Sequence, residues 1–407
     1  MTAPPLRILL ADADAFYVAV ARLVDPAGAG QARLLIVGGS AEHRGVVTSA
    51  SYEARAFGVR SAMPMSRAIR LCPGATVVPV PWEACAEKGR AIRNALEGFT
   101  PVVEQASSDE FYLDLTGTEH LYHEEPLART AERMRAAVHA STGLWVSIGG
   151  GTSKLVAKLA AGVAKPTPEL PGAGVHIVDT GAEAEFMRRF QLADLPMIGP
   201  RFQERLGRLG WRTVAQVQLL DRRELVARLG EREGHWLWER VRGVDAGTVA
   251  AWTEAKSISR DTTFATDLDA DDDLLRELLV QVDRATSDLR ADGLVARTIT
   301  VKLRDADFTT RQASRTLPEP VRTDRAVFAV SRELLQKLRT ARRAPSRLIG
   351  VALSQLERLG GEAQLALLET ERAQPPETEK DRSLANAIDA VRDRFGPDAL
   401  GRARTQG

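Results

Sequence analysis

Cysteine and histidine are scarce in this chain. Its 407 residues include two cysteines, Cys72 and Cys85, and six histidines. Two thiols are too few for a disulfide framework or a cysteine-based zinc site, and low cysteine use is typical of a reducing cytoplasm. The histidines within residues 120–123 lack a second ligand pair at zinc spacing, so we interpret this stretch as a solvated loop. No Ser/His/Asp or Cys/His grouping in the sequence supports nucleophilic hydrolysis.

Long apolar runs and a strong net charge are also missing. No run reaches the ~20 apolar residues of a membrane span, and no charged-then-apolar secretory leader opens the chain. We therefore expect a cytoplasmic protein without a membrane partner. With 44% hydrophobic and 27% charged residues, the composition is that of a globular protein. The length of 407 residues predicts roughly two to four domains.

The net charge of +1 hides an uneven distribution of charge. Residues 297–347 contain 13 lysines and arginines against 5 acidic residues, whereas residues 261–292 hold ten acidic residues. Within the basic segment, Ile299, Val301 and Leu303 alternate with polar and basic side chains, which predicts a strand with one buried and one basic face. A charged face is usually only solvated, but this local excess of cations favours contact with a nucleic-acid backbone. The acidic segment would face away from it.

Two acidic stretches are the candidates for chemistry. Residues 8–11 are a short apolar run of the kind expected for a buried strand, and the run ends in Asp12-Ala13-Asp14. Asp109 and Glu110 follow two serines and lie between two extended segments. Neighbouring side chains in a regular strand point to opposite faces, so these two acids can serve one site only at a turn or strand end. An isolated Asp-Glu pair is more often a plain polar turn.

Together, the two stretches predict a metal site. A carboxylate at the end of a buried strand is costly unless a metal, a donor or a partner compensates it. Three carboxylates from two strands can hold two metal ions ~4 Å apart for in-line attack at phosphorus. Mg²⁺ prefers such oxygen ligands. The pattern therefore favours phosphoryl or nucleotidyl transfer.

Five segments of the chain carry a resemblance to a known family. They are residues 12–17 (DADAFY), 50–64 (ASYEARAFGVRSAMP), 107–114 (SSDEFYLD), 153–160 (SKLVAKLA) and 164–166 (AKP). In this order and spacing they resemble the Y-family translesion DNA polymerases, in their DinB (DNA polymerase IV) branch. The likeness runs from about residue 6 to about residue 368.

The resemblance implies an α+β multidomain fold in the shape of a right hand. Its expected parts are a palm (1–15 and 78–170), fingers (16–77), a helical thumb with a helix-hairpin-helix (171–242), a linker (243–255), a little finger (256–368) and a C-terminal tail (369–407). The little finger would be a mixed α/β sheet platform, and the tail, with a helix at 383–395, has no assigned function. The glycines at 149–151 do not fit the phosphate-loop pattern, so they would form a strand-to-helix turn in the palm.

The same resemblance implies a template-directed DNA polymerase that adds dNTPs to a primer 3′ end. Asp12, Asp109 and Glu110 would be the catalytic residues and would hold two Mg²⁺ ions, or Mn²⁺ in their place. The Ala13 carbonyl would be a further ligand, and Asp14 would be structural. No segment is left over for a proofreading exonuclease, which implies low fidelity and translesion synthesis in DNA repair.

Nucleotide-binding residues are also implied by the resemblance, and they are Phe16, Tyr17, Ser49, Tyr52, Arg55 and Lys165. Tyr17 would lie against the sugar and leave no volume for a 2′-hydroxyl, unless it is an ordinary core aromatic. Tyr52 and Arg55 are three residues apart on one helical face and would reach the triphosphate. Taken alone, the same two residues would be a packed aromatic and a solvated arginine.

The implied partners are primer-template DNA, a dNTP and a sliding clamp, bound by a monomer at a bacterial nucleoid. The expected DNA contacts are Gly199, Lys302, Arg304, Arg311 and Arg315. Gly199 lies in a stretch, 195–200, that resembles a helix-hairpin-helix, with Met197 in place of a usual glycine. The candidate clamp-binding residues are Gln364, Leu365, Leu367 and Leu368, although so short a match arises easily by chance.

Two alternatives stay open at this point. A catalytically silent Y-family relative could act as a scaffold in a mutagenesis complex, but such relatives tend to lose Asp12, Asp109 and Glu110. A cyclase-like palm enzyme would leave the helix-hairpin-helix and the basic little finger unexplained. Ser153 also departs from the family, which more often has Asn at this place.

Overall fold

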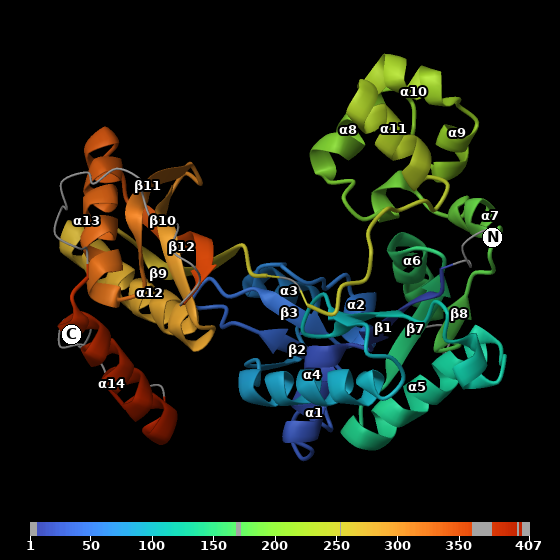
Figure 1. Cartoon of the computed structure of the whole chain (residues 1–407), viewed down its shortest axis with the longest axis horizontal. Helices are drawn as coiled ribbons and strands as arrows, with labels where there is room; N and C mark the ends of the chain where they lie inside the picture. Colours follow the sequence, from blue (N-terminus) through green and yellow to red (C-terminus); the bar gives the residue numbers. More distant parts are fainter. Residues whose placement is uncertain (1–5, 168–171, 253, 360–376, 397–398, 401–407) are drawn as a thin grey trace. The chain divides into compact units, whose positions relative to one another are not determined.

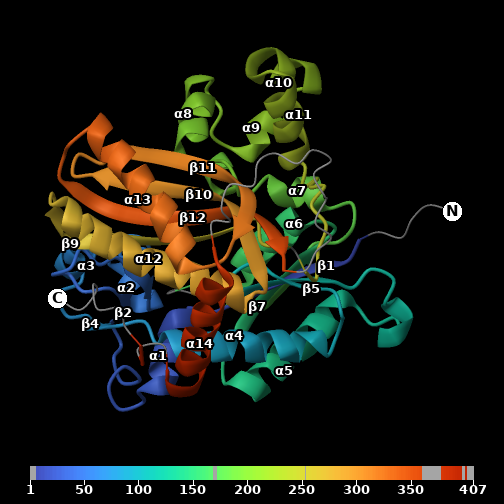
Figure 2. The same ribbon diagram turned by 60° about the vertical axis from the view of Figure 1, so that its left-hand side comes forward.

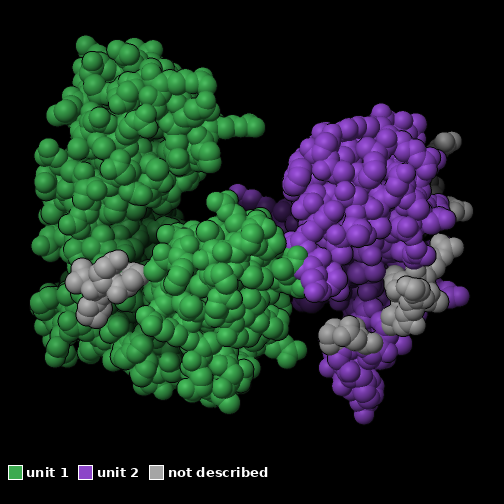
Figure 3. Space-filling model, turned by 180° about the vertical axis from the view of Figure 1, so that it is seen from behind, with its two compact units in different colours: residues 1–41, 45–253 green, residues 42–44, 254–407 purple. Residues whose placement is uncertain are grey.

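The chain forms two compact units. The structure, a computed structural model, describes residues 6–167, 172–252, 254–359, 377–396 and 399–400. The first unit comprises residues 1–41 and 45–253, and the second comprises residues 42–44 and 254–407 (Figure 3). Over the described residues, no helix is long and apolar enough to cross a bilayer.

A five-stranded sheet in the first unit carries both acidic stretches (Figure 1). Its order is β5-β6-β1-β7-β8, with bounds β1 Ile8–Ala13, β5 Val103–Gln105, β6 Glu110–Asp114, β7 Val146–Gly151 and β8 Val175–Ile177. Alternate residues of β1, from Leu9 to Ala13, pack in a core with α4 (Trp82–Glu97) and α5 (Leu127–Thr142). Ile8 and Leu10 pack on the other face against α6 (Lys154–Ala164). Strand alternation therefore places Asp12 on the α6 side.

Glycines of β7 let α6 lie close to this sheet. The predicted glycine turn is wrong in its position, because residues 149–151 are the end of β7 and only residues 152–153 separate strand from helix. A Cβ at Gly149 would lie 1.9 Å from the Ala161 nitrogen, so this glycine serves the close approach of the helix. Ser153 caps α6 by accepting from the Val156 amide at 3.2 Å, and it donates to the Gly243 carbonyl at 2.7 Å.

A second, three-stranded sheet of the first unit has the order β3-β2-β4. β2 (Leu35–Gly38) and β3 (Val47–Ala50) are antiparallel, and β4 (Thr76–Val78) runs parallel to β2. The helices here are α1 (Phe16–Val24), α2 (Tyr52–Ala56) and α3 (Met65–Leu71). Phe16 and Val20 of α1 pack in the core of the larger sheet, whereas Val18 and Ala21 pack on β2. Helix α1 therefore joins the two sheets.

Short helices follow the larger sheet, in the region expected to be the thumb. They are α7 (Glu183–Met187), η2 (Leu192–Asp194), α8 (Pro200–Arg208), α9 (Val214–Gln218), α10 (Arg222–Leu229) and α11 (Glu231–Arg240). Their core includes Leu155 and Val156, so they rest on the first turn of α6. The histidine stretch lies in η1 (Glu119–Tyr122), where the His120 side chain is 97% exposed and contacts Glu124, as expected for a solvated segment.

The second unit is an antiparallel sheet covered on one face by two helices (Figure 2). The sheet order is β11-β10-β12-β9, with bounds β9 Ser257–Leu268, β10 Leu294–Asp305, β11 Thr310–Val321 and β12 Ser346–Arg358. α12 (Asp271–Ala291) and α13 (Asp324–Ala341) share one core with the strands. Hydroxyl pairs, such as Thr300 with Ser314, line the other face.

Helix α14 (Glu379–Phe395) docks on this unit through ion pairs. Asp389 contacts Arg290 of α12 at 2.6 Å, and Arg392 contacts Asp283 at 2.8 Å. The sequence predicts a helix from residue 383, and the helix begins earlier because Thr378 and Asp381 form a capping box. Part of the expected tail therefore belongs structurally to the second unit.

Candidate active site

Asp12 and Glu110 lie opposite each other on neighbouring strands. They are register partners in the antiparallel pair of β1 and β6, and directly opposite side chains share a face of the sheet. Both therefore point to the α6 side. Burial raises the pKa of Asp12 to about 6, against the opposing effect of Lys165. A buried carboxylate of this kind is stabilised in its charged form by a cation.

Asp109 joins these two acids because it precedes the strand. β6 begins at Glu110, so strand alternation does not apply to Asp109, and the predicted location of this acid at a turn is confirmed. The Ser107 hydroxyl donates to Asp109 Oδ1 at 2.7 Å and accepts from the Glu110 amide at 3.1 Å. The Ala13 amide donates to the Asp109 carbonyl at 3.0 Å. This turn therefore fixes Asp109 beside the end of β1.

Two lysines contact the acids. Lys165 Nζ lies 2.6 Å from Asp12 Oδ1. Lys158 Nζ lies 2.8 and 2.6 Å from the two oxygens of Glu110. Among the described residues, no three His, Cys, Asp or Glu side chains form a ready metal-binding group. The carboxylate oxygens at adjacent strand ends nevertheless suit Mg²⁺, provided that the ammonium groups give way.

Sequence reasoning included Lys165 and overlooked Lys158. The spacing of seven residues places Lys158 two turns before Lys165, which directly follows α6 as its C-cap. An ion pair to a strand residue 48 positions away is not readable from helical spacing alone.

Ser49, Tyr52 and Arg55 converge at the start of α2. Arg55 donates to the Ala50 carbonyl at 2.9 Å and to the Ser49 hydroxyl at 3.4 Å. The Tyr52 hydroxyl is buried without a hydrogen-bond partner among the residues that the structure describes. Burial and the charges of Asp14 and Asp12 raise the pKa of Tyr52 to about 12. This hydroxyl therefore keeps its proton and is available as a hydrogen-bond donor.

Tyr17 presents its ring beside the acidic turn. Its hydroxyl lies 3.5 Å from Ser108 Oγ, and its ring meets Phe16 and Trp82 edge-on at centroid distances of 5.2 and 6.1 Å. The Phe16 side chain is buried in the core at 2% exposure, so Phe16 can offer a nucleotide only its backbone. Trp82, which is 66% exposed, was not among the predicted site residues.

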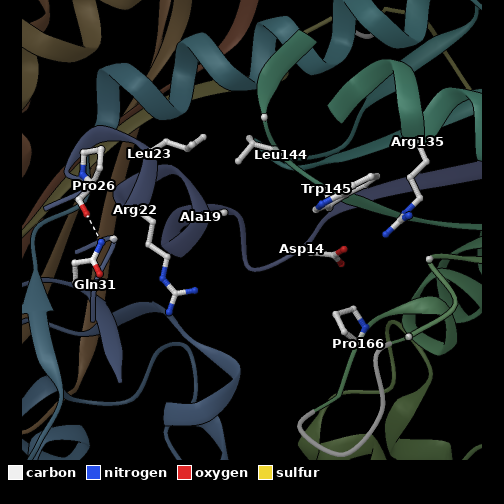
Figure 4. Close-up of a pocket in the computed structure, with 14 residues that line it drawn as sticks. Asp14, Ala19, Arg22, Leu23, Pro26, Gln31, Arg135, Leu144, Trp145 and Pro166 are labelled. Carbon is white, nitrogen blue, oxygen red and sulfur yellow. Dashed lines mark hydrogen bonds between the residues drawn. The ribbon is translucent and has the colours of Figure 1, made fainter. Parts of the chain in front are cut away.

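Asp14 lines a cavity of about 730 Å³ next to the acids (Figure 4). Arg22 and Arg135 also line it, on opposite sides. The Asp14 carboxylate accepts from the Ser147 hydroxyl at 2.8 Å, and the Asp14 amide donates to the Trp145 carbonyl at 3.0 Å. Burial raises the pKa of Asp14. These bonds hold the turn after β1, as a structural role requires.

The four predicted DNA-contacting cations of the second unit do not share a face. Arg311 is the register partner of the buried Leu303, and Arg315 is that of the buried Ile299. Arg311 contacts Asp305 at 2.8 Å, and Arg315 contacts Glu333 of α13 at 2.7 Å. Both arginines therefore lie on the helix side, and their assignment to one platform with Lys302 and Arg304 is wrong.

Lys302 and Arg304 do lie on the open face. Lys302 forms an ion pair with Asp261, and Arg304 donates to Thr310 Oγ1 at 2.9 Å. In the first unit, Gly199 precedes α8 as its N-cap, and Met197 has a φ of +71° and is 80% exposed. The candidate clamp-binding residues, 364–368, lie outside the described residues.

Known protein families match three separate parts of the chain. Family profiles match residues 11–162 (impB/mucB/samB family), 193–245 (DNA polymerase-iota, thumb domain) and 255–367 (impB/mucB/samB family C-terminal domain). DNA polymerase IV 1 of Mesorhizobium japonicum is 34% identical over 400 residues, which cover 97% of this chain and 86% of that protein. DNA polymerase IV of Caulobacter vibrioides is 35% identical over 396 residues, with coverage of 97% and 93%. The chain belongs to the DNA polymerase IV branch of the Y family.

Solved Y-family structures share its fold. A chimera of the Y-family polymerases Dbh and Dpo4 matches with a TM-score of 0.73 at 21% identity, covering 86% of this chain and 99% of that one. An insertion ternary complex of Dbh matches with a TM-score of 0.59 at 22% identity and coverage of 86% and 98%. The predicted right-hand α+β fold is thereby confirmed. Family membership also confirms a translesion DNA polymerase, in preference to a silent scaffold.

Proposed function

We propose that Asp12, Asp109 and Glu110 form the nucleotidyl-transfer centre of this Y-family DNA polymerase. The observation that carries the proposal is the register of β1 and β6, which aligns Asp12 with Glu110 and leaves Asp109 in the adjoining turn. Two Mg²⁺ ions, or Mn²⁺, held by these acids and the Ala13 carbonyl would activate the primer 3′-hydroxyl and stabilise the charge developing on the phosphate.

The residues around the acids would bind and orient the incoming dNTP. Arg55, Ser49 and the Tyr52 hydroxyl would donate to the triphosphate, because Arg55 and Ser49 contact each other at the start of α2 and the Tyr52 hydroxyl has no partner among the described residues. Lys165 would exchange Asp12 for a phosphate oxygen. Tyr17 would pack against the sugar, since its ring is held by edge-on aromatic contacts and its hydroxyl lies 3.5 Å from Ser108, next to Asp109.

The division of the chain into palm, fingers, thumb, linker and little finger, with the residue bounds given above, is part of the same proposal. Primer-template DNA would contact Gly199 in the thumb, and Lys302 and Arg304 on the open face of the little finger. The insertion ternary complex of Dbh supports DNA and nucleotide as substrates. We also propose a sliding clamp as a partner for residues 364–368, and a monomer in the bacterial cytoplasm.

Replacement of Asp109 tests the catalytic assignment. Asp109→Ala should remove most metal-dependent primer extension and leave primer-template binding near normal, because Asp109 lies at the metal site and not on the DNA-contacting surfaces. Asp114→Ala, at the other end of β6, is the matched control and should extend primers like the wild type. Near-normal primer extension by Asp109→Ala would show that the assignment of Asp109 to the catalytic centre is wrong.

A further inference from the structure

Lys158 holds a position that none of the proposed roles explains. Its ammonium contacts both oxygens of Glu110, at 2.8 and 2.6 Å. The lysine side chain is 36% exposed and that of Glu110 is 23% exposed, so the pair borders solvent without being an open surface contact. Helix α6 packs closely on β7, since a Cβ at Gly149 would lie 1.9 Å from the Ala161 nitrogen. The amine of Lys158 is therefore presented to Glu110 by a helix that is packed against the same sheet.

A count of charges shows what this contact does to the acidic centre. Asp12, Asp109 and Glu110 bring three negative charges, and Lys158 and Lys165 return two positive ones. A divalent ion that approaches this centre alone meets two ammonium groups that already contact two of its three ligands. An incoming triphosphate changes the balance, because its negative charges give the lysines another partner.

We propose that Lys158 is a resident cation that lowers the affinity of the centre for divalent metal until a nucleotide is bound. The inference rests on the proposed two-metal site, and it adds that Lys158 sets the metal affinity of this site. Lys158 acts here through Glu110, so it is a positioning residue and not a catalytic one. The expected result is a centre that loads metal and nucleotide together.

A second ion pair on the same helix provides a matched control. Lys154, one turn earlier on α6, contacts Glu104 at 2.6 Å, and both side chains are 19% exposed. Glu104 also accepts from the Ala250 amide at 2.9 Å, so this pair ties the palm to the segment that follows the thumb. It has the same chemistry as the Lys158 pair but involves none of the three acids.

Binding of Mn²⁺ to the full-length protein without DNA or nucleotide, measured by electron paramagnetic resonance, tests the proposal. Lys158→Met keeps the apolar stem and should bind Mn²⁺ roughly 1.5- to 5-fold more tightly, the range expected for loss of one partly exposed ion pair. Lys158→Arg retains the charge and should bind like the wild type. Lys154→Met should also bind like the wild type. Unchanged or weaker binding by Lys158→Met would overturn the proposal.

Two further measurements distinguish a failure of the Lys158 proposal from a wrong metal site and from unfolding of the variants. Asp109→Ala should lose Mn²⁺ binding; if it binds like the wild type, the metal centre itself is misassigned. If Asp109→Ala loses binding while Lys158→Met is unchanged, the metal centre stands and only the role of Lys158 is refuted. Melting temperatures of the three lysine variants establish whether the fold is intact, so that a change in Mn²⁺ affinity cannot arise from unfolding.

Discussion

Two partly buried polar residues at the acidic centre are suited to a bound substrate. Burial raises the pKa of the Asp12 carboxyl to about 6 although Lys165 contacts it, and the Tyr52 hydroxyl is buried without an acceptor among the described residues. Each group is unfavourable in the unliganded protein, because a charge or a donor is kept out of water. Each becomes favourable when a cation or a phosphate oxygen arrives.

The raised pKa of the Asp12 carboxyl should make the stability of the folded protein depend on pH. Its pKa is about 6 in the folded chain against a reference of 3.8, so the folded state holds the proton more tightly and loses stability as pH rises from about 4 to about 6. Asp12→Asn removes the ionisation and should be more stable than the wild type by ~1–3 kcal/mol above pH 6, with little difference below pH 4. Urea unfolding across this range measures the difference, and a gain that does not depend on pH would count against it.

Tyr17 should select against ribonucleotides. Its ring is held edge-on by Phe16 and Trp82, so Tyr17→Ala should open space for a 2′-hydroxyl and admit rNTPs while dNTP use persists. If Tyr17 is only a core aromatic, the variant would lose ~3–5 kcal/mol of stability without a change in sugar preference. The ratio of rNTP to dNTP incorporation, measured beside the melting temperature, distinguishes the two.

Met197 bears a backbone conformation that glycine adopts freely. Its φ is +71° and its side chain is 80% exposed, so little packing offsets the strain. Met197→Gly should therefore raise the free energy of unfolding by ~0.5–1 kcal/mol, because the left-handed region costs L-residues ~1–2 kcal/mol and the greater chain entropy that glycine loses on folding offsets ~0.5–1 kcal/mol of this. Chemical denaturation measures the change. A destabilised variant would mean that Met197 contributes contacts that its exposure does not suggest.

At the scale of elements, close packing of α6 on β7 sets the positions of Lys158 and Lys165. Gly149→Ala should force α6 away from the sheet, because its Cβ would lie 1.9 Å from the Ala161 nitrogen. We expect a loss of ~1–3 kcal/mol or more in stability and a loss of primer extension. Gly162→Ala, in α6 with nothing within 4 Å of its added Cβ, is the control and should gain up to ~1 kcal/mol. Equal behaviour of the two variants would contradict this account of the glycines.

The elements also show what the sequence could predict. β1, β6 and the turn at Asp109 were predictable, because an apolar run, alternation and a serine pair are local signals. The glycines of β7 were misread, since their role is a contact with a helix that follows them in the chain and only the folded sheet brings it there. Arg311 and Arg315 were assigned to the wrong face, because the loop between β10 and β11 sets the register and composition does not. Lys158 was missed for the same reason: its partner lies on another element.

For the whole molecule, grip on DNA should depend on the open face of the second unit. Lys302→Gln/Arg304→Gln should weaken primer-template binding for all sequences alike and reduce the slope of log affinity against log salt by roughly 1.8, because about two counterions fewer are released. Arg260→Gln/Arg315→Gln removes equal charge from arginines paired with Asp288 and Glu333 on the helix side. This control should change neither quantity, and an equal loss in both pairs would refute the choice of face.

Insertion of one nucleotide opposite each of the four template bases tests the central claim most directly. Purified full-length chain, a primer-template and one dNTP at a time are mixed with Mg²⁺ or with a chelator, and extended primer is counted. We predict that the complementary dNTP is inserted fastest opposite every base, that a chelator stops insertion, and that Asp12→Asn abolishes it. Insertion that ignores the template, or that persists in Asp12→Asn with Mg²⁺ present, would contradict a template-directed polymerase centred on these acids.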